Sequence, residues 1–143
     1  MSKYGGGCHC GNIQVWFETE LRPDDFTPRA CQCSFCRKHS TRALSDPSGH
    51  IHLTIKNGAG LSRYQFGTVS TEFLVCANCG VYVSAYMPDG DKAYANVMAN
   101  ALVNHETFGL GIPIDYGIED EVGKKERRRG NWSPATLTFD GKF

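Results

Sequence analysis

The seven cysteines of this chain fall into three tight clusters. Short C-x-C and C-x-x-C segments deliver two sulfurs to one point, as a tetrahedral zinc with Zn–S distances of roughly 2.3 Å requires. A closed site of four thiolates is structural, whereas a site of three thiolates keeps a fourth position for water or substrate. Because seven is four plus three, the chain can carry one zinc of each kind. We call the groups the first cluster (Cys8 and Cys10), the middle cluster (Cys31, Cys33 and Cys36) and the third cluster (Cys76 and Cys79).

Two partitions of these cysteines are open. In a zinc-ribbon arrangement the two C-x-x-C pairs make one four-thiolate site, and the remaining three cysteines come from two distant segments. In the other arrangement the first and third clusters close a structural site, and the middle cluster holds a reactive metal of its own. Parsimony favours the second arrangement, because every cluster is then used whole.

Composition predicts a single domain over residues 1–143. The hydrophobic fraction is 41%, a content that one core can account for at this length. Lys plus Arg and Asp plus Glu both number 15, so no net charge attracts nucleic acid or an anionic membrane. The first residues lack the apolar region of a signal peptide, and no stretch approaches the ~18 apolar residues of a membrane span. We therefore expect a cytoplasmic protein with small-molecule partners and no membrane or nucleic-acid partner.

This compartment bears on the state of the cysteines. A reducing cytosol disfavours structural disulfides, and an odd number of cysteines leaves one thiol unpaired in any scheme of disulfides alone. Metal binding is therefore favoured over redox-active thiols and over structural disulfides.

Strand patterns dominate the region that contains the clusters. Alternating apolar residues and turn residues predict strands at 13–17, 51–55, 61–66, 71–75, 81–87 and 93–98. The turn at 57–60 makes 51–55 and 61–66 a candidate hairpin, and the third cluster lies at the tip of a hairpin formed by 71–75 and 81–87. The fold class is therefore mostly β, with antiparallel sheets.

One short helix is expected after the start of the middle cluster. Ser34 is its predicted N-cap, which places Cys36 in the first turn. The positive end of that helix would help to hold Cys36 as a thiolate.

The C-terminal tail, residues 103–143, is interrupted by glycines and prolines and predicts long loops. Its basic run at 124–129 follows an acidic stretch at 119–121, so the favoured interpretation is a solvated loop. Capture of a carboxylate and nucleic-acid binding are the alternatives for this run.

The cysteine motifs and their flanks resemble a known family. The segments GGCHCG from Gly6, CQCSFCRK from Cys31 and FLVCANCG from Phe73, in this order, are similar to the glutathione-dependent formaldehyde-activating enzyme family, which also contains relatives of centromere protein V. The resemblance covers about residues 4–102. It implies a tent-like, zinc-stabilised β fold, with four structural cysteines in the first and third clusters and a reactive zinc on the middle cluster.

The activity that the resemblance implies is addition of the glutathione thiol to formaldehyde, formally a carbon–sulfur lyase reaction run backwards. With two zinc ions per chain, the ion on Cys31, Cys33 and Cys36 would be the catalytic one. Arg37 and Lys38 follow this cluster and are candidates to bind the carboxylates of glutathione. His39 lies one helical turn after Cys36 and is a candidate proton shuttle or fourth ligand.

Two functions of other classes compete with this enzyme. One is a binding module in which both zinc ions are structural, and the other is a thiol redox sensor that releases zinc on oxidation.

Overall fold

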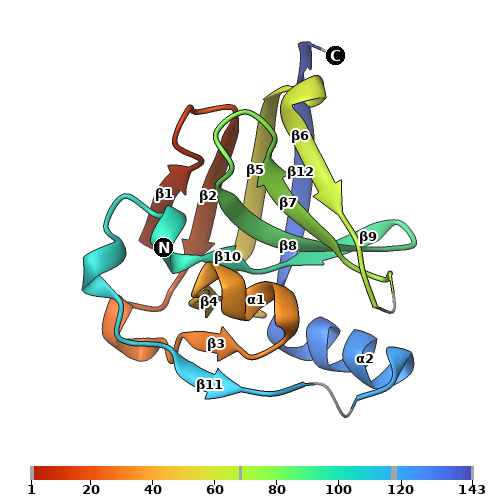
Figure 1. Cartoon of the computed structure of the whole chain (residues 1–143). Helices are drawn as coiled ribbons and strands as arrows, with labels where there is room; N and C mark the ends of the chain where they lie inside the picture. Colours follow the sequence, from red (N-terminus) through yellow and green to blue (C-terminus); the bar gives the residue numbers. More distant parts are fainter. Residues whose placement is uncertain (1, 68, 117–118, 143) are drawn as a thin grey trace.

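The computed structural model describes residues 2–67, 69–116 and 119–142, and these residues form two sheets and two α-helices (Figure 1). The larger sheet contains β1 (Ser2–Gly7), β2 (Ile13–Thr19), β5 (His50–Asn57), β6 (Leu61–Tyr64), β7 (Glu72–Cys76), β8 (Tyr82–Asp89), β9 (Lys92–Ala95) and β12 (Ser133–Lys142). The smaller sheet contains β3 (Arg29–Cys31), β4 (Ala43–Leu44), β10 (Val97–Met98) and β11 (Ile112–Ile114). The helices are α1 (Ser34–His39) and α2 (Glu121–Asn131), with 3₁₀ turns η1 (Pro23–Asp25), η2 (Gly58–Gly60), η3 (Ala99–Ala101) and η4 (His105–Thr107).

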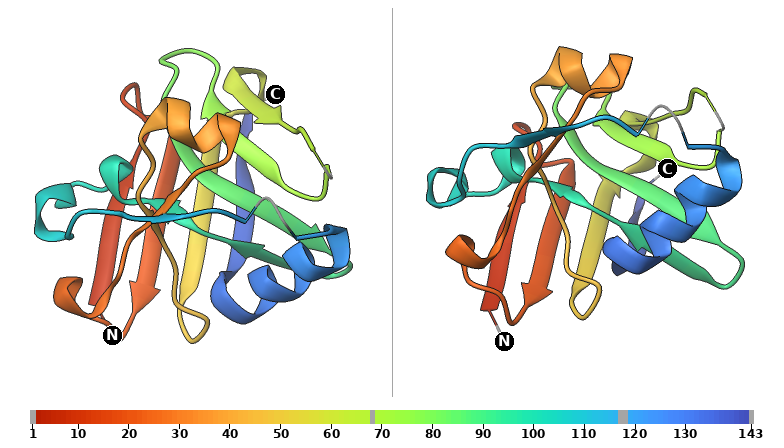
Figure 2. Two further views of the ribbon diagram at one scale, coloured as in Figure 1. Left: turned by 60° about the horizontal axis from the view of Figure 1, so that its bottom comes forward. Right: turned by 90° about the horizontal axis from the view of Figure 1, so that it is seen from below.

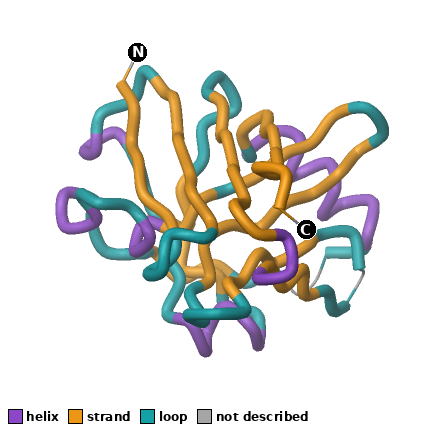
Figure 3. Tube along the Cα trace, turned by 90° about the horizontal axis from the view of Figure 1, so that it is seen from above, coloured by secondary structure: helices purple, strands orange, loops and turns teal. Residues whose placement is uncertain are grey.

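The two sheets are mixed. Strand order is β1-β2-β5-β12-β9-β8-β7-β6 in the larger sheet and β10-β4-β3-β11 in the smaller one. Most neighbours are antiparallel, as predicted, but β12 runs parallel to β5 and β11 runs parallel to β3. Seen from below, the smaller sheet and both helices lie on one side of the larger sheet (Figure 2), and from above the helices lie at the periphery of the strands (Figure 3). The prediction of a mostly β fold with a short helix in the middle cluster is confirmed.

Strict alternation of apolar residues explains the central strands. In β5 the side chains of Ile51, Leu53 and Ile55 are completely buried, while the residues between them are partly exposed. The same alternation buries Ile13 and Phe17 in β2, which pairs with β5 in antiparallel register. These strands were predictable because successive side chains of a strand point to opposite faces of the sheet.

The predicted hairpins have different outcomes. β7 and β8 form an antiparallel pair whose connecting turn carries the third cysteine cluster, as predicted. The hairpin between 51–55 and 61–66 is wrong, because β6 pairs with β7 and not with β5. β2 and β12 already occupy both edges of β5, so β6 finds its partner elsewhere.

The strand predicted at 93–98 is divided at Asn96 into β9 and β10, which belong to different sheets. The side-chain oxygen of Asn96 accepts a hydrogen bond from the backbone N–H of Ala85 at 2.9 Å. This buried contact takes the place of a strand-to-strand bond and lets the chain change sheets.

The long loops predicted for the tail are wrong over much of its length. Residues 121–131 form α2, and residues 133–142 form β12, which lies in the middle of the larger sheet between β5 and β9. Asp120 caps α2 by accepting a hydrogen bond from the N–H of Gly123 at 2.7 Å. Gly130 lies in the last turn of this helix and Pro134 near the start of β12, where both residues are tolerated. No helix of the described ranges is long and apolar enough to cross a membrane.

A close approach of two backbones at Gly6 gives the first testable prediction. A Cβ at this position would stand 2.1 Å from the carbonyl oxygen of Ala101 and 2.7 Å from Cα of Leu102. We expect Gly6→Ala to lower the free energy of unfolding by about 1–3 kcal/mol, measured by urea denaturation, because backbone atoms must move apart. Gly109→Ala is the control, since a Cβ there meets no atom of the described residues within 4 Å. Equal urea midpoints for the two variants would contradict the prediction.

Candidate functional site

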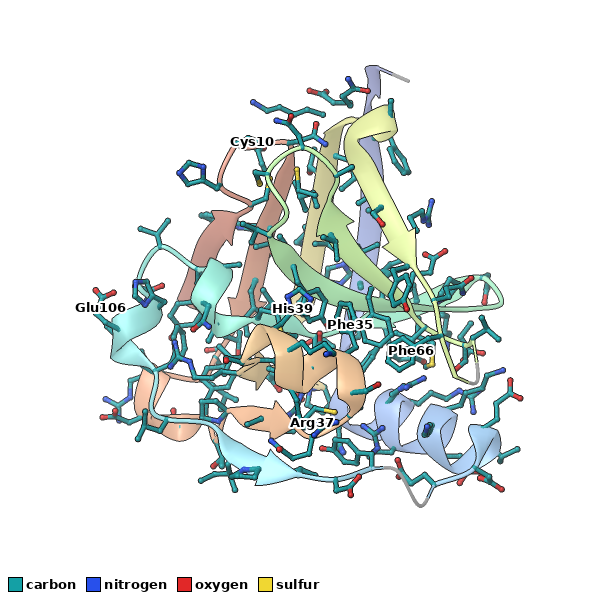
Figure 4. The ribbon with its side chains drawn as sticks, in the orientation of Figure 1. Cys10, Phe35, Arg37, His39, Phe66 and Glu106 are labelled. Atoms are coloured by element: carbon teal, nitrogen blue, oxygen red, sulfur yellow. The ribbon has the colours of Figure 1, made fainter. Side chains whose placement is uncertain are left out.

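The first and third cysteine clusters meet at the tips of two hairpins and form one group, the four-cysteine cluster (Figure 4). Its four Sγ atoms all lie within 4.8 Å of one another. The Sγ atom of Cys10 is 3.8 Å from that of Cys8 and 3.5 Å from that of Cys76. Two thiolates on one tetrahedral zinc would be separated by about 3.8 Å. The cluster therefore has the spacing and the ligand number of a closed metal site, and it joins the first hairpin to the β7–β8 hairpin.

Backbone donors surround these sulfurs. The N–H of Ile13 donates to Cys8 Sγ at 3.2 Å, and the N–H of Cys79 donates to Cys76 Sγ at 3.4 Å. Burial raises the pKa of Cys8 to about 11. Burial also acts to raise the pKa of Cys79, but backbone donors and the neighbouring sulfurs together outweigh it and lower that pKa to about 6. The pKa of Cys10 is lowered as well, mainly by a hydrogen bond from Asn78, so two sulfurs are prepared as thiolates, whereas the buried Cys8 needs a cation before it ionises.

The middle cluster, hereafter the cysteine triad, lies at the turn from β3 into α1. β3 ends at Cys31 and α1 begins directly after Cys33, which brings the three Sγ atoms within 4.8 Å of one another. Cys33 is the N-cap residue, because its Sγ atom accepts a hydrogen bond from the N–H of Cys36 at 3.3 Å. The predicted cap at Ser34 is therefore wrong by one residue, whereas the place of Cys36 in the first turn is confirmed.

The thiolate that its surroundings stabilise is that of Cys33, and not the predicted one of Cys36. Hydrogen bonds from Cys31 and then Cys36 hold the pKa of Cys33 far below its usual range, and backbone N–H groups add to this effect. The same sulfur contacts, together with burial, raise the pKa of Cys36. Three adjacent thiols cannot all ionise unless a cation lies between them. A set of three soft thiolates fits zinc or another thiophilic metal, and all seven cysteines are free of disulfides.

A cavity of about 120 Å³ adjoins the triad, and all three triad cysteines line it. We call it the triad cavity. Phe73, Tyr82, Met98 and Trp132 give it apolar walls. Cationic side chains line it as well, from β3 and α2: Arg29, Lys124, Arg127 and Arg128. None of the described residues that line this cavity belongs to the four-cysteine cluster, so the two metal-binding groups have different surroundings.

Comparison with known proteins places these features in a family. Residues 3–110 match the family of the glutathione-dependent formaldehyde-activating enzyme. The chain belongs to this family. A solved structure of a protein from Rhodobacter sphaeroides aligns with a TM-score of 0.50 at 26% identity, covering 70% of this chain and 88% of that one. No curated protein matches the chain.

The match to the formaldehyde-activating family includes all seven cysteines and ends before α2 begins. Both cysteine groups therefore belong to the part that this chain shares with the family. The cations that α2 brings to the triad cavity lie outside that part. The resemblance found from the motifs alone, over about residues 4–102, is confirmed.

The three predicted substrate contacts after the triad have different positions. Arg37, Lys38 and His39 are all exposed. Arg37 lines an open depression next to Cys31 and Cys36, on a different side of α1 from His39 (Figure 4). The ring of His39 packs on Phe35 at 4.5 Å between centroids, and none of the three is among the described residues that line the triad cavity.

The basic run at 124–129 is another feature whose predicted structure is wrong. It forms part of α2, and Arg128 is buried with 9% of its surface exposed. The solvated loop is thus contradicted for this segment. The signal that was present is Trp132, four residues after Arg128, whose ring lies 5.2 Å from the guanidinium carbon.

Proposed function

We propose that this member of the formaldehyde-activating family is a zinc-dependent enzyme that condenses a thiol, most simply glutathione, with a small aldehyde. The observation that carries the proposal is the contrast between the two cysteine groups. Four sulfurs form one group whose ligand number is complete, whereas three sulfurs form the other and line a cavity. A three-thiolate zinc keeps a position for an exchangeable ligand, which is the arrangement of catalytic sites.

The reaction forms one carbon–sulfur bond. The thiol sulfur attacks the carbonyl carbon, the π electrons of the carbonyl move to its oxygen, and the thiol proton ends on that oxygen. The product with glutathione and formaldehyde is S-hydroxymethylglutathione, and its breakdown is a carbon–sulfur lyase reaction. Zinc on the triad would stabilise the thiolate or polarise the carbonyl oxygen.

The chain's own residues contribute to this step through the triad cavity. Burial, and then the neighbouring thiolates, raise the pKa of Tyr82, so its hydroxyl remains protonated and can donate a hydrogen bond to the developing oxyanion. The aromatic walls at Phe73 and Trp132 keep water away from the carbonyl carbon, which favours addition of the thiol over hydration.

Outside the cavity, Arg37 is the best-placed of the predicted glutathione contacts, because it lines a depression together with Cys31 and Cys36. We propose that it binds a carboxylate of glutathione, as a guanidinium does with two donors. Lys38 and His39 remain weaker candidates at the exposed surface of α1.

Metal content and product formation test the proposal together. We expect about two zinc ions per purified chain, measured by plasma mass spectrometry, one for each cysteine group. With ¹³C-formaldehyde and glutathione, exchange NMR should show faster interconversion of free formaldehyde and its thiol adduct than in the uncatalysed mixture. A protein with two metals that leaves this exchange rate unchanged would support a binding module instead. Peroxide treatment that releases zinc reversibly under mild conditions would support a redox sensor.

A further inference from the structure

Three buried polar atoms on residues that line the triad cavity have no hydrogen-bond partner among the described residues. They are Oγ1 of Thr41, Oγ1 of Thr71 and Nε of Arg128, and these are all the buried unpaired side-chain nitrogen and oxygen atoms found among the described residues. The three residues are 5%, 3% and 9% exposed, and each lines the triad cavity. Burying a polar group without a partner costs free energy. Three such groups around one cavity therefore point to a ligand that accepts their hydrogen bonds.

The guanidinium of Arg128 is held in place but not neutralised. Its Nη1 donates to Ser70 Oγ at 2.8 Å, and its plane lies over Trp132. Other cations of the same helix are paired with carboxylates: Lys125 with Glu121, Arg127 with Glu119, and Arg129 with Asp89. Among the ion pairs of the described residues, Arg128 has no carboxylate partner, although it is the most buried cation of α2. A buried charge of this kind requires an anion.

A second guanidinium strengthens the positive character of the cavity. Arg29 of β3 lines it and donates through Nη2 to the hydroxyl of Ser45 at 2.7 Å. Arg29 also has no ion pair in the described part of the chain. The triad sulfurs are the counter-charges nearby, but zinc would neutralise most of their charge when bound. The cavity therefore combines uncompensated positive charge, hydroxyl donors and aromatic walls.

The size of the cavity and its donors define the chemical class of the ligand. A carboxylate is planar, carries one negative charge and accepts several hydrogen bonds at once, including bonds from a guanidinium. It fits a cavity of about 120 Å³ with flat apolar walls. A phosphate dianion is bulkier and tetrahedral, and it fits such a cavity less well.

We propose that the triad cavity is a carboxylate subsite, in which Arg128, with Thr41 and Thr71, binds a carboxylate carried by the substrate that reacts at the triad. This inference rests on the proposed function for the identity of the reacting groups, but not for the binding of the anion. The carboxylate can belong to the aldehyde, as in a 2-oxo acid such as glyoxylate, or to the thiol, as in glutathione. Because Arg128 lies beyond residue 110, membership of the family does not determine this preference.

Binding of an unreactive carboxylate tests the subsite without turnover. Titration of the zinc-loaded full chain with propionate, followed by ¹H–¹⁵N NMR, should give a saturable shift of signals from the cavity. Arg128→Met should weaken propionate binding on the order of tenfold or more, because a charge-assisted hydrogen bond is lost. Arg129→Met removes the same charge from the same helix at a residue paired with Asp89, and it should bind propionate as the unmodified chain does.

A second variant covers the case in which Arg128→Met fails to fold. Thr71→Val keeps the shape and every charge but removes one unpaired hydroxyl, and it should weaken propionate binding severalfold. Circular dichroism and zinc content must match the unmodified chain for either variant to be used. Equal propionate binding by the folded variants and the unmodified chain, or no saturable binding at all, would overturn the subsite.

Two kinetic comparisons identify the source of the carboxylate. In the first comparison, 2-mercaptoethanol serves as a neutral thiol, and the rates of adduct formation with glyoxylate and with formaldehyde are measured. If the unmodified chain prefers glyoxylate and Arg128→Met loses this preference, the carboxylate belongs to the aldehyde. In the second comparison, formaldehyde is the aldehyde, and the rates with glutathione and with its diethyl ester are measured. If the unmodified chain prefers glutathione and Arg128→Met loses this preference, the carboxylate belongs to the thiol. Propionate binding in a chain that forms no adduct with any pair would support the subsite and contradict only the proposed function.

Discussion

Replacing Cys76 by serine is expected to unfold the chain. Cys76 is 1% exposed and lies in the β7–β8 hairpin, and its sulfur is 3.5 Å from that of Cys10 in the first hairpin, so it lies where the four-cysteine cluster joins the two hairpins. Apparent zinc binding energies for structural sites are about 10–16 kcal/mol, as large as the net stability of a whole domain, about 5–15 kcal/mol. A serine oxygen is a poor ligand in place of a thiolate, so most of this energy would be lost.

The measurements are far-UV circular dichroism, urea denaturation and zinc content of Cys76→Ser purified in parallel with the unmodified chain. Ala77→Ser is the matched control, since it adds a hydroxyl to the same turn at an exposed residue that is not a ligand. Removal of zinc from the unmodified chain with a strong chelator should reproduce the unfolding, and added zinc should reverse it. A Cys76→Ser variant with an unchanged urea midpoint would show that the four-cysteine cluster does not hold the fold.

The parts of this fold that could be predicted are those with a local signal. Alternation of apolar residues identified β2 and β5, because a strand with one buried face has an apolar residue at every second position, a pattern visible within a few residues. The division of the cysteines into groups of four and three also agrees with the structure. Spacing allowed two divisions, and this one was favoured because it uses every cluster whole.

The parts that could not be predicted depend on distant partners. β12 forms a parallel pair with β5, a strand about eighty residues earlier, and no pattern within its own sequence indicates that partner. β6 appeared to close a hairpin with β5, but the edges of β5 are taken by β2 and β12. Local sequence therefore predicted the strands with clear alternation, but it missed β12 as a strand and did not predict all of the pairings.

The candidate site divides in the same way. Its sulfurs are close in sequence and were found, whereas Arg128 comes from a helix in the C-terminal tail. Within a run of six charged residues no single cation is distinguished by composition. Arg128 differs from Arg129 because α2 turns it toward the triad cavity, and it differs from Arg127, which also lines the cavity, because Arg127 is paired with Glu119.

The second large effect is expected at Cys33, and it should be a loss of activity without loss of the fold. Cys33 is both a triad sulfur and the N-cap of α1. Serine is among the best N-cap residues, so Cys33→Ser keeps an acceptor for the N–H of Cys36 while it removes one thiolate. We expect zinc to fall from about two ions per chain to about one. The rate of adduct formation should fall by at least about a hundredfold, since even indirect changes at metal sites cost tenfold to a hundredfold.

Ser34→Ala is the control for this variant, because Ser34 is exposed, follows Cys33 in α1 and is not a ligand. It should retain two zinc ions and the full rate. Free energies of unfolding within about 1 kcal/mol of that of the unmodified chain for both variants would separate the roles of the two cysteine groups, because loss of a structural zinc costs far more. If Cys33→Ser instead unfolds as Cys76→Ser does, the triad is a second structural site. If it loses zinc and keeps the full rate of adduct formation, the reaction does not take place at the triad.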